Sequence, residues 1–377
     1  MSRTRRGDAE LFFRDLTQGG PPGLPEDVDE AEAFYAELTG VRRAAPELQP
    51  VRSTRGFDAS VEQVPVPTAP TIAVPAPRGV AYDGTSLYTV HRTAGEVHRF
   101  APVAGATGTV IATLPPPANS VPVASNAFVG PTFVRNGATN ELVIAEFGDL
   151  TVNDAGHGSG RIHALSTAGV YRGVIASRDT TRDNRFLWGP AGSADLGSGR
   201  LAQSSFWGNR VTAMNVSDGS ARVEVDFSGL TGRSDPRLGT PMRVGPDPLA
   251  LHPTGYLVIG DRNNGRLLRA RPGERAAEMR TGLADPIGIT CLAGGDVVVV
   301  SKGDPTGMSA CHRLTVASRG GVPAVTGART LVEFPSTLGR ARGCTTMLRS
   351  GRETVVVAIA VDGTPGAGDG LYFVDPS

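Results

Sequence analysis

The chain has 377 residues, of which 40% are hydrophobic and 20% charged, so it holds enough apolar material for a large buried core. Its 37 basic and 37 acidic residues cancel, which removes the electrostatic case for binding nucleic acid or an anionic membrane surface. The 49 glycines and 29 prolines interrupt the sequence too often for long helices and favour many short strands.

Residues 1–68 differ in character from the rest of the chain. Apolar residues recur at helical spacing within 8–16 and, more clearly, within 26–39, where acidic residues fill the first turn and Gly40 follows the last. The segments around these patterns are rich in glycine, proline and polar residues, as linkers are. We expect a short, partly helical extension that serves docking or assembly or else frays, because helices this short are marginal alone.

The amino terminus places acidic residues where a secretory signal has an unbroken apolar stretch, and no later segment offers about 20 consecutive apolar residues. We therefore expect a soluble, cytoplasmic protein. Three cysteines, Cys291, Cys311 and Cys344, are too few and too irregularly spaced for a disulfide framework or a zinc motif. Ordinary buried thiols are the simplest interpretation.

From Thr71 onward one pattern recurs six times: a turn, a short apolar strand, a Gly/Asp/Asn turn, and a second apolar strand that ends in a polar residue. Successive copies, measured at one equivalent position in each, are 52, 60, 57, 40 and 55 residues apart. Strand-rich repeats of this size predict an all-β, six-bladed β-propeller of four-stranded antiparallel blades over residues 69–377. The last copy has only three strands, so we expect the apolar segment 71–74 to supply its outer strand and close the ring.

The fourth copy, which begins at Pro246, resembles an NHL repeat. The matching residues are Pro246, Leu249, Ala250, Gly255, Leu257, Val258, Asp261, Asn264, Arg266 and Leu267. Residues 71–377 as a whole resemble the six-bladed propellers that include NHL proteins, gluconolactonase-like hydrolases and strictosidine-synthase-like proteins. The resemblance implies the fold, but this architecture hosts lactonases, lyases and protein-binding platforms alike.

In such a propeller the first strand of each blade lines a central channel, and two rings of residues border one end of it. The mouth ring, at the start of each first strand, is read as Arg78, Gly130, Pro190, Asp247, Ile287 and Arg342. The second ring, at the end of each second strand, is read as His91, Glu146, Ser205, Asp261, Ser301 with Lys302, and a position near Asp362.

The mouth ring carries two arginines that belong to adjacent blades once the ring is closed. Gluconolactonase-like enzymes hold a divalent cation in the channel, largely with acidic and amide side chains of this ring, but here Asp247 is the only such ligand. Arg78 and Arg342 repel a cation and suit a carboxylate or phosphate. We therefore predict a site for a small anionic ligand from Arg78, Arg342 and Asp247, with Ser205 and Trp207 contributed by the third blade. The aromatic residues beside Ser205 either stack on a ligand or pack between blades.

A structural role for the two arginines is the alternative. Each arginine would then be paired with a carboxylate, such as Asp83 or Asp362, and would hold adjacent blades together.

Four second-ring residues are the candidates for catalysis: His91, Glu146, Asp261 and Lys302 can act as general acids or bases in a partly desolvated mouth. The competing interpretation is structural, since the acid at the position of Asp261 in NHL-like repeats hydrogen-bonds the following turn.

Metal binding is a further alternative. A long loop after the second strand of blade two holds Asp149, Asn153 and Asp154, which can ligate Ca²⁺ or form a solvated turn. Amidating lyases of this propeller group bind Zn²⁺ through histidines, and here His91, His157 and His312 come from different blades.

Two hypotheses therefore stand. In the first, the protein is an NHL-like propeller that binds a protein partner or a small anionic ligand at its loop-bearing face. In the second, it is a metal-dependent hydrolase, lactonase or lyase of the gluconolactonase-like group. The missing acidic ligands in the mouth ring favour the first.

Overall fold

The computed structural model describes residues 64–116, 128–136, 139–147, 160–177, 187, 189–206, 208–223, 225–232, 244–303, 308–361 and 366–377. All of them belong to one compact unit, Glu47–Ser377. The helical patterns expected within residues 1–63 lie outside the described residues. Among the described residues there is no helix with the length and hydropathy needed to cross a membrane.

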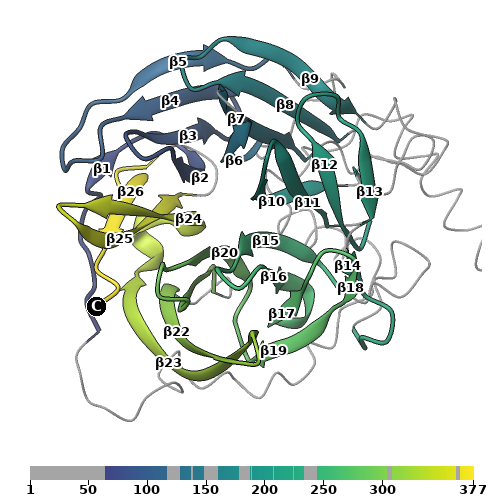
Figure 1. The fold of residues 1–377 in the computed structure, drawn as a ribbon. Helices are drawn as coiled ribbons and strands as arrows, with labels where there is room; N and C mark the ends of the chain where they lie inside the picture. Colours follow the sequence, from purple (N-terminus) through teal and green to yellow (C-terminus); the bar gives the residue numbers. More distant parts are fainter. Residues whose placement is uncertain are drawn as a thin grey trace, which may run out of the picture. The chain divides into compact units, whose positions relative to one another are not determined.

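The described residues form six four-stranded antiparallel sheets around a central axis (Figure 1), so the protein is a six-bladed β-propeller. This confirms the fold predicted from the repeats. The innermost strands are β2 (Pro77–Tyr82), β6 (Phe128–Asn136), β10 (Pro190–Gly197), β15 (Pro246–Leu251), β20 (Pro286–Cys291) and β24 (Arg340–Arg349).

Three further strands complete each blade in the order of the chain. The second strands are β3 (Leu87–His91), β7 (Thr139–Glu146), β11 (Arg200–Ser205), β16 (Leu257–Asp261), β21 (Val297–Ser301) and β25 (Arg352–Ala360). The third strands are β4 (Glu96–Phe100), β8 (Arg161–Ser166), β12 (Arg210–Asn215), β17 (Arg266–Ala270), β22 (Ser309–Arg319) and β26 (Gly370–Val374). The outer strands are β5 (Thr109–Thr113), β9 (Tyr171–Ser177), β13 (Ala221–Val223), β19 (Ala277–Thr281), β23 (Val322–Phe334) and β1 (Ile72–Ala73).

The core lies between the faces of neighbouring blades. The second strands β16 and β21 are buried along their whole length, because each sheet packs against a neighbour on both faces. The outer strands β5 and β19 alternate between exposed and half-buried residues, since they face solvent. This arrangement explains why the second strands read as continuous apolar runs and the outer strands do not.

The ring is closed by β1, which joins the last blade although it precedes the first blade in the chain. Ile72 pairs with Leu371 of β26, and Ala73 pairs with Gly370. Ile72 is fully buried in an apolar cluster with residues of both the first and the last blade. The carboxylate of Asp369 adds polar bonds at the same place, because it accepts the Ala76 N–H at 2.8 Å and the Val361 N–H at 2.6 Å.

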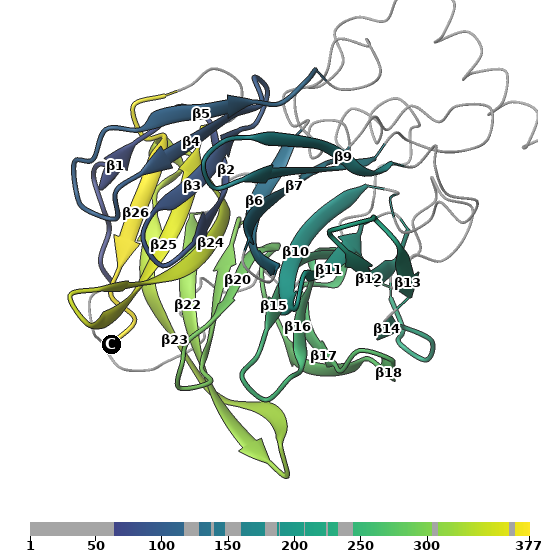
Figure 2. The same cartoon turned by 45° about the horizontal axis from the view of Figure 1, so that its top comes forward.

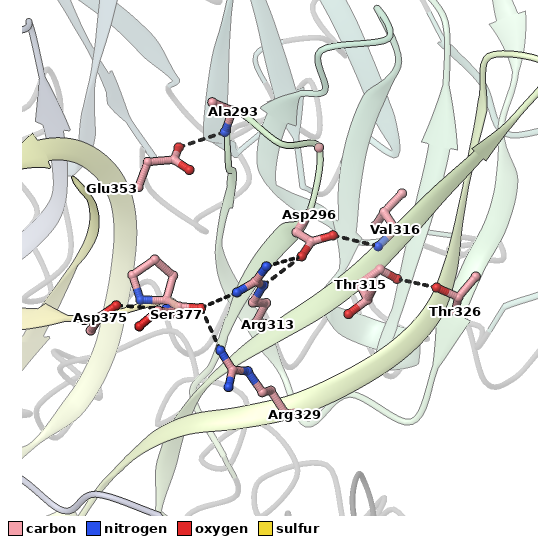
Figure 3. A network of polar contacts seen from close by, with 12 residues as sticks. Ala293, Asp296, Arg313, Thr315, Val316, Thr326, Arg329, Glu353, Asp375 and Ser377 are labelled. Carbon is pink, nitrogen blue, oxygen red and sulfur yellow. Dashed lines mark hydrogen bonds and ion pairs between the residues drawn. The ribbon is translucent and has the colours of Figure 1, made fainter. Parts of the chain in front are cut away.

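The carboxyl-terminal tail ties the last two blades together. Arg313 of β22 pairs with Asp296 at 2.7 Å and donates a hydrogen bond to the carbonyl oxygen of Pro376 at 2.6 Å (Figure 3). Arg329 of β23 donates to the same carbonyl at 2.8 Å. The chain end after β26 is thereby held on blade five, so closure does not depend on β1 alone.

Two features lie outside the regular blades. Strands β14 (Val225–Asp226) and β18 (Glu274–Arg275) form a short parallel pair that links blade three to blade four. Strands β22 and β23 form a hairpin that projects beyond its neighbours (Figure 2). On the edge of this hairpin, the N–H of Glu333 donates to the carbonyl of Pro65. Residue 65, which we expected in the extension, therefore contacts blade five.

Candidate functional site

The six innermost strands enclose a cavity of about 390 Å³ along the propeller axis. Neighbouring inner strands touch backbone to backbone near their first residues. A Cβ added at Gly79 would lie 2.5 Å from the Cα of Gly130, and one added at Gly192 would lie 1.7 Å from the carbonyl oxygen of Asp247. Glycines at these positions let the strands converge, so the starts of the inner strands form one narrow mouth.

Every inner strand also has a β-bulge close to this mouth. The register of the pairing with the second strand shifts between Arg78 and Ala81, Val129 and Pro131, Pro190 and Ser193, Pro246 and Leu249, Pro286 and Gly288, and Ala341 and Gly343. A bulge re-aims the side chain at its position and increases the local twist. The mouth-ring residues therefore lie in irregular backbone, and the alternation of a regular strand does not predict the direction of their side chains.

Five of the six predicted mouth-ring residues line the cavity. They are Arg78, Gly130, Asp247, Ile287 and Arg342. Pro190 was expected in this ring and is not part of the lining, where the third blade contributes residues 192–195 instead. Pro190 pairs with Ser205 as Pro77 pairs with His91 and Pro246 with Asp261, so the residue of the third blade that corresponds to Arg78 and Asp247 is Ala191.

Arg78 and Arg342 occupy neighbouring inner strands at the mouth, as the closed ring predicted. The residues that follow them meet: a Cβ on Gly343 would lie 3.0 Å from the Cα of Gly79. Both arginines are buried, with 7% and 3% of their surface exposed. The carboxylate of Asp83, a candidate partner for these arginines, binds within its own turn to Thr85, Ser86 and Tyr88.

Asp247 shares the guanidinium of Arg262 with a second acid. Arg262 Nη1 donates to Asp247 Oδ2 at 2.9 Å, while its Nε and Nη2 donate to the two oxygens of Asp285 at 2.6 and 3.0 Å. The guanidinium also lies 5.7 Å from the ring centroid of Phe206, which itself packs near Phe147 of blade two. Phe206 therefore packs between blades.

The second-ring residues end their strands opposite the first residues of the inner strands. His91 pairs with Pro77, Glu146 with Phe128, Ser205 with Pro190, Asp261 with Pro246 and Ser301 with Pro286. In the last blade the equivalent residue is Ala360, opposite Arg340 and two residues before Asp362. None of these six residues is part of the cavity lining.

The two acids of the second ring are fully buried within ion pairs. Asp261 accepts hydrogen bonds from the Gly245 N–H at 2.9 Å and from the side chains of Asn264 and Arg266 at 2.7 Å. Glu146 Oε2 pairs with Arg161 at 2.7 Å and with His163 at 2.9 Å. Both acids thus hold the start of the third strand against the second strand, which agrees with the structural interpretation of these positions.

His91 is half-buried, and burial lowers the pKa of its imidazole. Its Nδ1 accepts the N–H groups of Thr93 and Ala94 at 3.3 and 3.1 Å, so the ring is oriented by the turn that follows β3. The catalytic roles suggested for His91, Glu146, Asp261 and Lys302 stay predictions.

The residues of one further set at the mouth include Arg92 and Arg262, which the sequence analysis did not select. These residues directly follow the second strand, and each donates its N–H to the carbonyl of the residue before the inner strand: Arg92 to Ala76, Phe206 to Gly189, Arg262 to Gly245 and Lys302 to Asp285. Arg92 and Lys302 are only 1% and 3% exposed. The signal was present in the sequence as arginine, lysine or an aromatic residue one position after the second-ring residue of each of the first five blades.

Several predicted site residues lie outside the described part of the chain: Trp207, Asp149, Asn153, Asp154, His157 and Asp362. Within the residues that the structure describes, no group of three or more His, Cys, Asp or Glu side chains is arranged to hold a metal ion. The predicted Ca²⁺ and Zn²⁺ sites stay predictions. Of the three cysteines, Cys291 and Cys344 line the cavity and Cys311 is buried, and burial raises the pKa of all three thiols.

Comparison with known proteins shows similarity in fold. Neither a protein-family model nor a curated protein sequence matches the chain. The PQQ-bound aldose sugar dehydrogenase of Streptomyces coelicolor is 15% identical, with 83% of this chain and 98% of that chain covered and a TM-score of 0.51. A Thermus thermophilus protein assigned as an oxidoreductase (glucose dehydrogenase) is also 15% identical, with 77% and 92% covered and a TM-score of 0.50. The shared feature is the six-bladed β-propeller fold.

Proposed function

We propose that this protein is a binding propeller that takes a small anionic ligand, a carboxylate or a phosphate, at the mouth of its central channel. The observation that carries the proposal is the arginine pair. Arg78 and Arg342 are buried side by side on adjacent inner strands and both contribute to the wall of the cavity. Two guanidinium groups in one low-dielectric mouth favour an anion there.

The charges along the cavity support this assignment. The charged residues in its lining are Arg78, Arg135 and Arg342 against Asp195 and Asp247. Arg135 and Asp195 lie near the far ends of their strands, so the charged lining residues near the mouth are two arginines and one acid. Because Asp247 is already paired with Arg262, it does not cancel the arginine pair. A guanidinium presents a planar fork of donors that fits a carboxylate or phosphate.

The alternative, a metal-dependent hydrolase, lactonase or lyase, receives less support. Two of its candidate residues, Glu146 and Asp261, are completely buried and bound to arginines, and neither lines the cavity. A carboxylate acts as a general base within hydrogen-bond reach of the proton that it removes, and neither of these two carboxylates is part of the cavity lining. Docking of a protein partner on the loop-bearing face stays a prediction.

The proposal is tested by calorimetry and thermal shift with three anions: inorganic phosphate, citrate, and PQQ, a polycarboxylate bound by the S. coelicolor dehydrogenase. We expect saturable binding of at least one anion by the parent chain and a loss of roughly tenfold or more in affinity in the variant Arg78→Gln with Arg342→Gln. The matched control is Arg135→Gln, which changes an arginine in the same cavity away from the mouth and should bind as the parent does. Equal binding by the parent and the double variant, or no binding by the parent, would overturn the proposal.

A further inference from the structure

The charges at the channel mouth are distributed unequally across the axis. The inner strands are in contact in the order β2, β6, β10, β15, β20, β24 and back to β2. Strand β15, which carries Asp247, is therefore three blades from β2, which carries Arg78, and two blades from β24, which carries Arg342. Strand β15 lies across the propeller axis from β2 (Figure 1), and Arg78, Arg342 and Asp247 all line the cavity.

Asp247 belongs to an ion-pair cluster whose formal charge is negative. Asp247 and Asp285 share the single guanidinium of Arg262, so these three side chains sum to a formal charge of −1. Arg262 binds Oδ2 of Asp247, and among the described residues no side chain or backbone N–H donates to Oδ1. Asp247 lines the cavity. A carboxylate oxygen facing a cavity in this setting is an acceptor for a ligand cation.

We infer that the ligand of this mouth is an amino-carboxylate, with its carboxylate on Arg78 and Arg342 and its ammonium group on Asp247. The inference rests on the proposed function, because it uses the same arginine pair for the anionic end. A zwitterion satisfies both sides of the mouth, whereas a dianion brings a second negative charge toward Asp247. A diamine brings a positive charge toward the arginines. The cavity volume of about 390 Å³ suits a small molecule of this kind.

The inference can be tested on the unmodified chain with three sets of probes that have equal length and different charges. Calorimetry would compare ω-amino acids from β-alanine to 6-aminohexanoate with the dicarboxylates and the diamines of the same carbon number. We expect the best amino acid to bind roughly tenfold or more tightly than the dicarboxylate of equal length, and the diamine to bind least. Because the ranking is measured on the parent chain, it does not depend on whether any variant folds.

Variants assign the preference to Asp247. Asp247→Asn should remove the preference for the amino acid while binding of the dicarboxylate is kept or improved. Asp195→Asn is the matched control, because Asp195 also lines the cavity but lies near the far end of β10. It should leave the preference unchanged.

The outcomes distinguish the inference from the proposed function. If dicarboxylates bind as tightly as amino acids of equal length, or if Asp247→Asn leaves the preference intact, the inference is wrong and the anion site stands. If phosphate binds the parent chain but no carboxylate does, the inference alone is wrong. If neither phosphate nor any carboxylate binds, both are wrong.

Discussion

Gly79 and Gly343 are in backbone contact across the boundary between the first and the last blade. A Cβ on Gly343 would lie 3.0 Å from the Cα of Gly79, and a Cβ on Gly79 would lie 2.5 Å from the Cα of Gly130 in the next blade. The residues that precede the two glycines, Arg78 and Arg342, are carried to the same side of the mouth by this contact. The close approach of two inner strands and the position of the arginine pair therefore have one cause.

Because of this contact, we expect the substitution Gly79→Ala to lower the free energy of unfolding strongly. Gly79 has a φ of +66°, and its added Cβ would lie 2.5 Å from the Cα of Gly130, so the blades must separate. We expect a loss of about 3 kcal/mol or more in the free energy of unfolding. Gly84→Ala is the control, because Gly84 has a φ of +101° with nothing within 4 Å of its Cβ position, and it should lose about 1 kcal/mol. Denaturant unfolding of both variants measures the difference; similar losses would contradict the tight mouth.

The arginine pair predicts a stability effect of its own in the absence of ligand. If the two guanidinium groups repel each other in the empty protein, replacing both by glutamine holds or raises the melting temperature. If each arginine instead anchors an acid, the same change leaves buried carboxylates uncompensated and destabilises the fold by roughly 3 kcal/mol or more. We expect the first result. Melting curves of the parent and the double variant in phosphate-free buffer decide between them.

Closure by β1 predicts different results for two truncations. Deletion of residues 1–63 should leave the melting temperature nearly unchanged. Deletion of residues 1–76 also removes Ile72 and Val74, which are buried, and bares the edge of β26. The loss of two buried aliphatic side chains should cost roughly 4 kcal/mol. Equal melting temperatures for the two proteins would show that β1 is not needed for closure.

His312 predicts a loss of stability in acid. It lies in β22 with its Nδ1 at 3.1 Å from the hydroxyl of Thr330, and burial lowers its pKa from 6.5 to about 4. Since the unfolded chain binds the proton more tightly than the folded chain, the contribution of His312 is complete above pH 6.5. It is lost as the pH falls toward 4, by roughly 3 kcal/mol.

The variant His312→Gln should flatten this part of the stability profile, since glutamine does not titrate. Denaturant unfolding at a series of pH values from 7 to 4 measures the profile of both proteins. Parallel profiles for the parent and the variant would assign the acid sensitivity to other groups.

The sequence determined the fold and one part of the site. Its repeats predicted six blades, because the inner strands of each blade are buried on both faces and appear in the sequence as one pair of apolar segments per repeat. The unpaired segment 71–74 and the three-stranded last copy together indicated where the ring closes, and closure made Arg78 and Arg342 neighbours. These inferences need only the order of the repeats along the chain and the assumption that the blades close into a ring.

The tertiary structure alone decided which side chains face the cavity. A strand alternates its faces with every residue, so a one-residue bulge moves a side chain from one face to the other. In the third blade the predicted register was one residue off, so Pro190 is not part of the lining. The repeat pattern also did not select Arg92 and Arg262, which directly follow second-ring residues. The ion-pair cluster of Asp247, Arg262 and Asp285 joins side chains of two blades. No spacing within one repeat encodes such a contact, since it depends on how closely neighbouring blades pack.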